Sequence, residues 1–142
     1  MPHNPALIQE TRAWFAKARN DLEVAAFEMT ASPPFLEDVL LHAQQAAEKS
    51  MKGLLTWHGQ VFRKTHDLEE LAQASVPFIP EATLLFRKAV PLTEYAWTFR
   101  YPGDRPEPTK REAEEALGLA RRLYETILKK LPSAVKPPPR GK

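Results

Sequence analysis

Two short polar segments carry the side chains best suited to chemistry in this sequence. His66-Asp67 stands where a helix is expected to begin, and Arg100-Tyr101 precedes a proline-rich loop. Histidine can transfer a proton near neutral pH or bind a phosphate, while arginine binds phosphate oxygens in pairs and tyrosine offers a ring for stacking. Structural roles are equally open, because Asp67 favours the positive end of a helix dipole and Arg100 can pair with a helix carboxylate.

A further polar set follows one flank of a helix expected from Pro34 to His58. The other side of this helix is rich in alanine, so that a neighbouring helix can approach closely. The flank carries Gln44, Gln45, Glu48 and Lys52, and Lys49 lies in the same segment. A polar flank beside a close-packed seam suits a dimer interface or a polar groove. The alternative is a solvated face with a Glu48–Lys52 ion pair, worth ~0.3–0.5 kcal/mol.

Other kinds of site find no support in the residues. The chain has no cysteine, no glycine-rich phosphate loop, no His-Glu-x-x-His and no Gly-x-Ser-x-Gly. His42 has Glu37, Asp38 and Glu48 nearby in sequence, but there is no second Glu-x-x-His of the kind a di-iron bundle requires. We therefore expect no metal and no cofactor, and assign no catalytic residue.

The charge of the chain is unevenly distributed. The formal net charge is +2, but residues 129–142 contain five basic residues and no acidic one, which leaves 15 basic against 18 acidic residues elsewhere. The rest of the chain is therefore net negative, which is a poor match for the negatively charged backbone of RNA or DNA. Neither a signal peptide nor an apolar run of about 18 residues is present, so we expect a cytoplasmic protein without membrane association.

The spacing of apolar residues, together with residues that start or stop helices, predicts an all-α fold. The expected helices are Ala6–Thr30, Pro34–His58, a short one after Thr65, Glu81–Ala89 and Thr109–Leu131, with another turn or two in Leu92–Tyr101. Short connections favour a four- to five-helix up-and-down antiparallel bundle. This bundle would form one domain over residues 1–131, followed by a disordered Pro/Lys-rich basic tail over 132–142. We expect it to bring Gln44, Gln45, His66 and Arg100 to one polar seam.

The segment from Ala43 to Leu71 resembles the HEPN domain, which has an Ala-Gln-Gln-Ala-x-Glu-Lys helix, a short loop and His-Asp-Leu opening the next helix. Trp14 and residues 18–22 are similar to the family's first helix, and Phe99-Arg100-Tyr101-Pro102 is similar to the Arg-Tyr-Pro before its last helix. The likeness extends from Trp14 to Leu128. It implies ligand-binding roles for a set of polar residues: Gln44, Gln45, Lys49, Lys52, His66, Asp67, Arg100 and Tyr101.

The resemblance departs from HEPN ribonucleases at one motif. Those enzymes carry an arginine and a histidine separated by four to six other residues, and two copies meet across a dimer. After Arg100 the required positions hold Arg105, Pro106 and Glu107, and no histidine elsewhere has an arginine at that spacing. The missing motif predicts a protein without nuclease activity.

Without the nuclease motif, the resemblance implies a HEPN subunit that forms a homodimer, binds a minimal nucleotidyltransferase and binds a nucleotide. Two alternatives stay open. One is a toxin-like, metal-independent RNase that uses His66 with Arg100 or Arg63. The other is a purely structural helical bundle.

Overall fold

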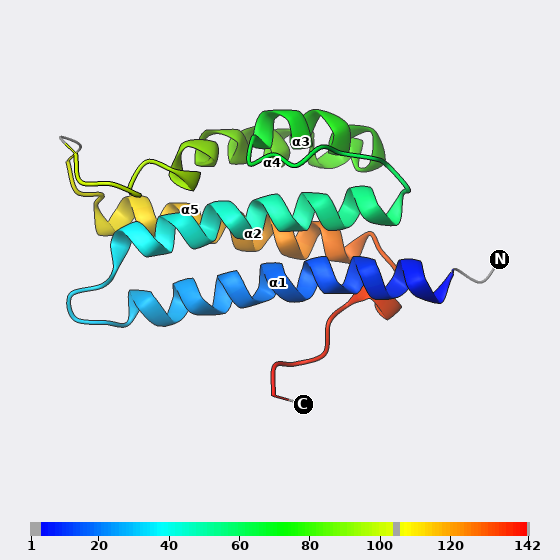
Figure 1. The fold of residues 1–142 in the computed structure, drawn as a ribbon, viewed down its shortest axis with the longest axis horizontal. Coiled ribbons are helices and arrows are strands. Elements are labelled where there is room, and N and C mark those ends of the chain that lie inside the picture. The colour runs from blue at the N-terminus through cyan, green and yellow to red at the C-terminus, as the bar shows by residue number, and fades with distance from the viewer. Residues whose placement is uncertain (1–3, 104–105, 142) are drawn as a thin grey trace.

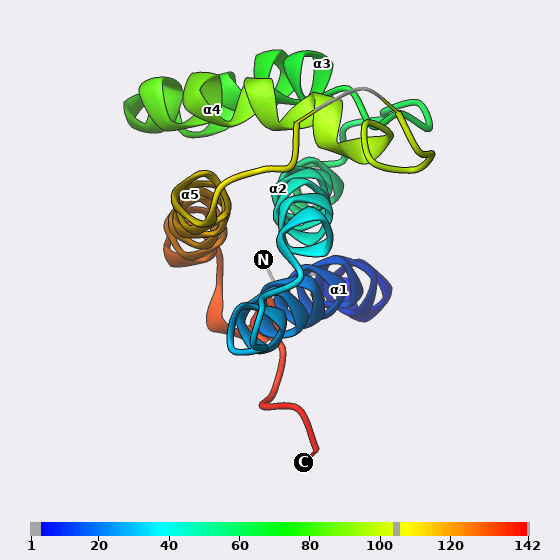
Figure 2. The ribbon, with the colours of Figure 1, turned by 90° about the vertical axis from the view of Figure 1, so that its left-hand side faces the viewer.

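Three long helices lie side by side in the computed structural model, which describes residues 4–103 and 106–141 (Figures 1 and 2). They are α1 (Pro5–Met29), α2 (Leu36–Trp57) and α5 (Lys110–Lys129). Within the two described ranges there is no strand. The predictions of an all-α fold and a helical bundle are confirmed.

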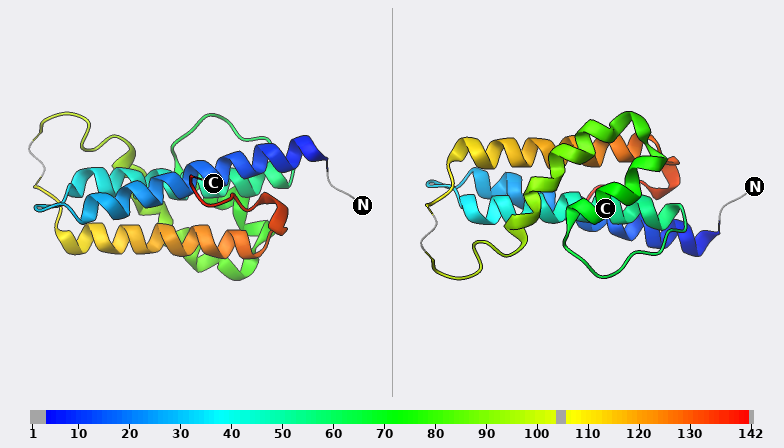
Figure 3. Two further views of the ribbon diagram at one scale, coloured as in Figure 1. Left: turned by 90° about the horizontal axis from the view of Figure 1, so that it is seen from below. Right: turned by 90° about the horizontal axis from the view of Figure 1, so that it is seen from above.

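Shorter helices form a second layer over α2 and α5, on the side away from α1 (Figure 2). In chain order they are α3 (Leu68–Ser75), η1 (Val76–Phe78), η2 (Pro80–Ala82), α4 (Thr83–Ala89) and η3 (Val90–Ala96). Prolines break this stretch into pieces because proline lacks the N–H that a continuous helix needs. The layer carries the chain back along the bundle, so α5 runs in the same direction as α2 and opposite to α1 (Figures 1 and 3).

Small residues on α2 let α1 approach it closely. Ala43, Ala46 and Ala47 are fully buried, as the alanine-rich stripe predicts. Gly53 extends the same seam, because a Cβ there would lie 2.6 Å from Cε2 of Phe15. Since real Cβ atoms do not come so close to another carbon, the ring of Phe15 occupies space that only a glycine leaves open.

Side chains satisfy the free N–H groups at the start of three helices. Asn4 accepts a hydrogen bond from Ala6 N, Asp67 from Glu69 N and Thr109 from Glu112 N. Helix α2 is different, because its first residue is Leu36 and Phe35 before it provides no side-chain cap.

The segment after α5 packs against α1, although the sequence offers it little to bury. Ser133–Val135 form η4, and Val135 is fully buried. The guanidinium of Arg12 donates two hydrogen bonds to the carbonyl of Ala134, at 3.0 and 2.6 Å, and Arg140 pairs with Glu23 at 2.8 Å. One buried valine and three ionic or polar contacts therefore link residues 132–141, for which the sequence predicts a disordered tail, to α1. Lys142 lies outside the described residues.

A helix that spans a membrane needs about 20 predominantly apolar residues in succession. None of the helices in the described part of the chain is both long and apolar enough to cross a bilayer.

Candidate functional site

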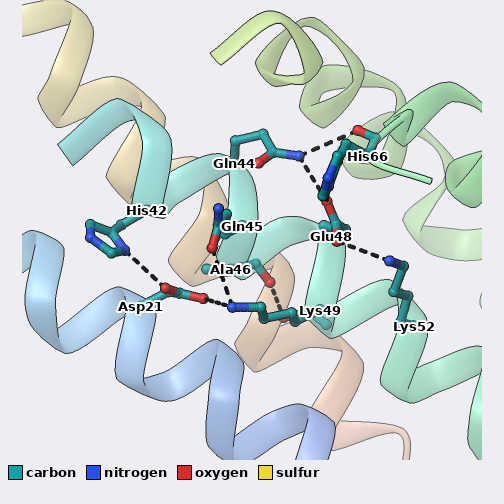
Figure 4. Close-up of polar contacts among 10 residues, drawn as sticks. Asp21, His42, Gln44, Gln45, Ala46, Glu48, Lys49, Lys52 and His66 are labelled. Atoms are coloured by element: carbon teal, nitrogen blue, oxygen red, sulfur yellow. Dashed lines mark hydrogen bonds and ion pairs between the residues drawn. The ribbon is translucent and has the colours of Figure 1, made fainter. Parts of the chain in front are cut away.

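A buried carboxylate on α2, that of Glu48, contacts three of the eight predicted site residues (Figure 4). Oε1 of Glu48 lies 2.8 Å from Nδ1 of His66 and accepts a hydrogen bond from Nε2 of Gln44 at 3.1 Å. Its Oε2 accepts one from Nζ of Lys52 at 2.9 Å. We call Gln44, Glu48, Lys52 and His66 the Glu48 cluster. Three of them lie one turn apart on α2, and His66 comes from the loop before α3.

Most of this cluster is closed to solvent. Glu48 is 4% exposed, Gln44 is fully buried, and the Lys52 ammonium lies 5.6 Å from the ring centroid of Trp14 and 5.8 Å from that of Phe62. Gln44 also donates to the carbonyl of His66 at 3.3 Å. Because a buried charge is tolerated only when paired and hydrogen-bonded, these contacts explain how Glu48 and Lys52 can both be buried.

His66 is the member of the cluster that an outside molecule can reach. Its side chain is 57% exposed, while Nδ1 faces Glu48. An ionised carboxylate accepts hydrogen bonds only, so Nδ1 carries the proton and Nε2 is the nitrogen left for another partner. Next along the chain, Asp67 is occupied as the cap of α3. The arrangement orients His66 and fixes the start of α3 in place.

Gln45 and Lys49 belong to a second network, between α1 and α2 (Figure 4). Nζ of Lys49 lies 2.7 Å from Oδ2 of Asp21 and 3.3 Å from Oε1 of Gln45. Nδ1 of His42 lies 2.9 Å from Oδ1 of Asp21. We call these four residues the Asp21 cluster. It joins two helices and presents no side chain to the Glu48 cluster.

The charge of His42 is favoured by its surroundings. The hydrogen bond with Asp21 raises the pKa of His42 above its usual value, against the opposing effect of burial. The negative charges of Asp21 and Glu28 raise the pKa further. His58 behaves in the opposite way, because burial lowers its pKa, and its ring stacks on Phe78 with centroids 4.0 Å apart.

Arg100 and Tyr101 lie away from both clusters. Both are exposed, and Arg100 lines a small hollow beside Glu37 and Asp38 in the first turn of α2. Asp38 and Glu48 are ten positions apart on that helix, which corresponds to about 15 Å. The structure therefore does not bring Gln44, Gln45, His66 and Arg100 to one seam. It brings Gln44 to His66, Gln45 to Lys49, and leaves Arg100 at the end of the bundle.

Sequence reasoning misses two partnerships. The apolar stripe of the first helix puts Asp21 on the solvent side, yet this residue is 7% exposed. A signal is present, since Asp21 lies three residues after Ala18 and four before Ala25, both core residues, and so shares their face. The contact of Glu48 with His66 has no sequence signal, because a loop of unknown path connects them.

Histidine and carboxylate groups do not gather into a metal site in the part of the chain that the structure describes. His42, which has Glu37, Asp38 and Glu48 nearby in sequence, instead lies against Asp21, with Glu28 3.9 Å away. His3 lies outside the described residues.

Comparison with known proteins agrees with this fold and these motifs. The HEPN domain family matches residues 11–131. The chain belongs to the HEPN family. The crystal structure of TT1696 from Thermus thermophilus is similar, with a TM-score of 0.70 and 33% sequence identity, over 85% of this chain and 98% of that one. A comparison with curated proteins found no match.

Proposed function

We propose that this HEPN protein is a non-catalytic helical subunit that forms a homodimer and binds a minimal nucleotidyltransferase. The observation that carries the proposal is the absence of the nuclease motif. Arg105, Pro106 and Glu107 stand where a HEPN ribonuclease needs a histidine after Arg100. Without that histidine the family's arginine has no acid–base partner at the expected place.

The positions of His66 and Arg100 further support a non-catalytic role. An RNase of a different design would need a histidine and an arginine on the same phosphate, within hydrogen-bond reach. His66 is tied to Glu48, while Arg100 lies beside Asp38 and Leu41 in the first two turns of α2, roughly 10–15 Å from Glu48 along that helix. Arg63, the other arginine considered, is paired with Glu70 at 2.9 Å.

Nucleotide binding is a second part of the proposal. Arg100 and Tyr101 are both exposed at the end of the bundle, where a guanidinium can bind phosphate and a phenol ring can stack on a base. A nucleotide that binds only the folded protein must raise its melting temperature. The melting temperature of the Arg100→Ala variant should then not respond to the nucleotide.

Co-expression with a minimal nucleotidyltransferase from the same genome tests the main proposal. We expect the two proteins to copurify through affinity and size-exclusion steps, with the mass of the complex requiring two HEPN subunits. A protein that stays monomeric and elutes apart from the nucleotidyltransferase would contradict the proposal. An inactive nucleotidyltransferase variant serves as a control that binding does not depend on turnover.

A further inference from the structure

Two adjoining hollows lie along the first turn of α2. This end of the helix is on the left in Figure 1. The larger has a volume of about 380 Å³ and is lined by Phe35, Glu37, Asp38 and Glu107 together with three prolines. The smaller, about 70 Å³, shares Glu37 and Asp38 with it and is also lined by Trp97 and Arg100. We call the two hollows together the α2-end groove.

Aromatic rings border this groove and face solvent. Phe35 is 60% exposed in the larger hollow and Trp97 is 52% exposed in the smaller one. Exposed large apolar groups are ordinary when scattered singly, but two that border adjoining hollows are typical of a binding surface. Aromatic rings are also the side chains that most often anchor protein partners.

Two of the three carboxylates of the groove have no cationic partner among the described residues. Neither Glu37 nor Glu107 forms an ion pair with another described residue. The pKa of Glu28 is raised first by burial and then by the neighbouring carboxyl group of Asp38, whose negative charge also raises the pKa of His42. Arg100 is the one cation among the described residues that line the groove, against three carboxylates.

We infer that the α2-end groove binds an arginine-containing segment of a partner protein, with the guanidinium held between the exposed rings and the carboxylates. Arginine fits both features, because its planar group stacks on aromatic faces and pairs with carboxylates through two hydrogen bonds. The inference rests on the proposed function in one respect only, namely that this chain binds a partner protein.

The basic tail of a second copy is a less suitable occupant. It carries proline, lysine and arginine, but each copy holds its own tail against α1. Arg12 binds the carbonyl of Ala134, Arg19 binds that of Pro138, and Arg140 pairs with Glu23. Moving the tail to another copy would break these contacts, whereas a partner's segment would break none.

A labelled peptide of alternating arginine and proline is the direct probe, followed by fluorescence anisotropy at low salt. We expect binding below about 1 mM, a net interaction of roughly 4 kcal/mol. A glutamate–proline peptide should not bind. The double variant Glu37→Gln/Glu107→Gln should bind at least tenfold more weakly, and Trp97→Ala should also bind more weakly.

Matched controls separate this groove from general charge attraction. Glu114→Gln/Glu115→Gln removes the same charge from the exposed face of α5 and should leave binding unchanged. Arg100→Ala removes the competing cation and should strengthen binding, although it should weaken binding of a nucleotide. Absence of peptide binding, or equal weakening in both double variants, would overturn the inference. Thermal melting of each variant confirms that it is folded.

The complex with a minimal nucleotidyltransferase tells the two proposals apart. If it forms with the wild-type chain and is lost in Glu37→Gln/Glu107→Gln, both hold. If it forms equally with that variant, the groove inference fails and the proposed function stands. If the arginine peptide binds and no complex forms, the groove inference stands and the proposed function fails. The groove would belong to a second copy if self-association is lost in that variant, or on deletion of residues 132–142, while binding of the arginine peptide is unchanged. That result would overturn the inference.

Discussion

The middle and the beginning of α2 carry similar side chains but neutralise their charges differently. In the middle, Glu48 is surrounded by donors from Lys52, Gln44 and His66 and is closed to water. At the beginning, Glu37 and Asp38 face a hollow with exposed rings and few cations. The buried carboxylate of Glu48, whose charge is neutralised by its neighbours, stabilises the fold. The exposed carboxylates at the beginning of α2, which have few cations around them, are available to a ligand. Position in the helix, rather than residue type, separates the two roles.

Of the substitutions that test this difference, removal of Lys52 should change the free energy of unfolding most. Lys52→Met leaves Glu48 buried with its counter-ion gone, and we expect a loss of roughly 3–5 kcal/mol in the free energy of unfolding. Urea denaturation measures it. Arg111→Ala, which breaks an exposed one-turn pair with Glu115, should cost less than about 0.5 kcal/mol. Similar losses in the two variants would mean that the Glu48 cluster is not desolvated in the folded protein.

The close contact of α1 with the middle of α2 should give the next largest effect. Gly53→Ala places a methyl group against the buried ring of Phe15, and we expect destabilisation of about 1–3 kcal/mol. Gly118→Ala in α5 meets no atom within 4 Å and should stabilise by about 0.5–1 kcal/mol, because alanine favours helices. Denaturation of both variants checks the opposite signs, and stabilisation by Gly53→Ala would show that the seam is looser than described.

A smaller, pH-dependent effect should come from the Asp21 cluster. The folded protein raises the pKa of His42, so the folded state binds the proton more tightly than the unfolded one. This stabilisation is complete below the unfolded value near 6.5, and it is lost as pH rises through the higher folded value. NMR titration of His42 should follow that course, and Asp21→Asn should lower its pKa. A pKa of His42 below that of His58 would contradict the structure.

The beginning of α2 should tolerate substitution best. Glu37→Gln removes a carboxylate that has no cationic partner among the described residues, so the free energy of unfolding should change by less than about 0.5 kcal/mol. Differential scanning calorimetry at neutral pH gives the comparison with Lys52→Met. A loss of several kcal/mol on Glu37→Gln would remove the distinction between the two parts of α2.

The helices could be predicted from the sequence because their signals are local. Apolar spacing gave the long helices to within about two residues, and Thr109 and Asp67 mark helix starts that the structure has. The site depended on contacts between distant segments. Nothing near Glu48 in the sequence specifies His66 as its partner, and the burial of Val135 depends on the packing of η4 against the distant helix α1.

The family and its missing motif could also be read from the residues, since the Ala-Gln-Gln and His-Asp-Leu segments are short and ordered along the chain. Which polar residues share a surface could not. Gln44 and Gln45 are neighbours in sequence, but about 100° of helix rotation sends them to different networks.

The central claim is that His66 is held by a structural network and that the protein does not cleave RNA. Incubation of the purified wild-type protein with RNA in the presence of EDTA tests it most directly, with His66→Ala in parallel. We expect intact RNA in both reactions. Cleavage by the wild type that disappears in a folded His66→Ala variant would contradict it.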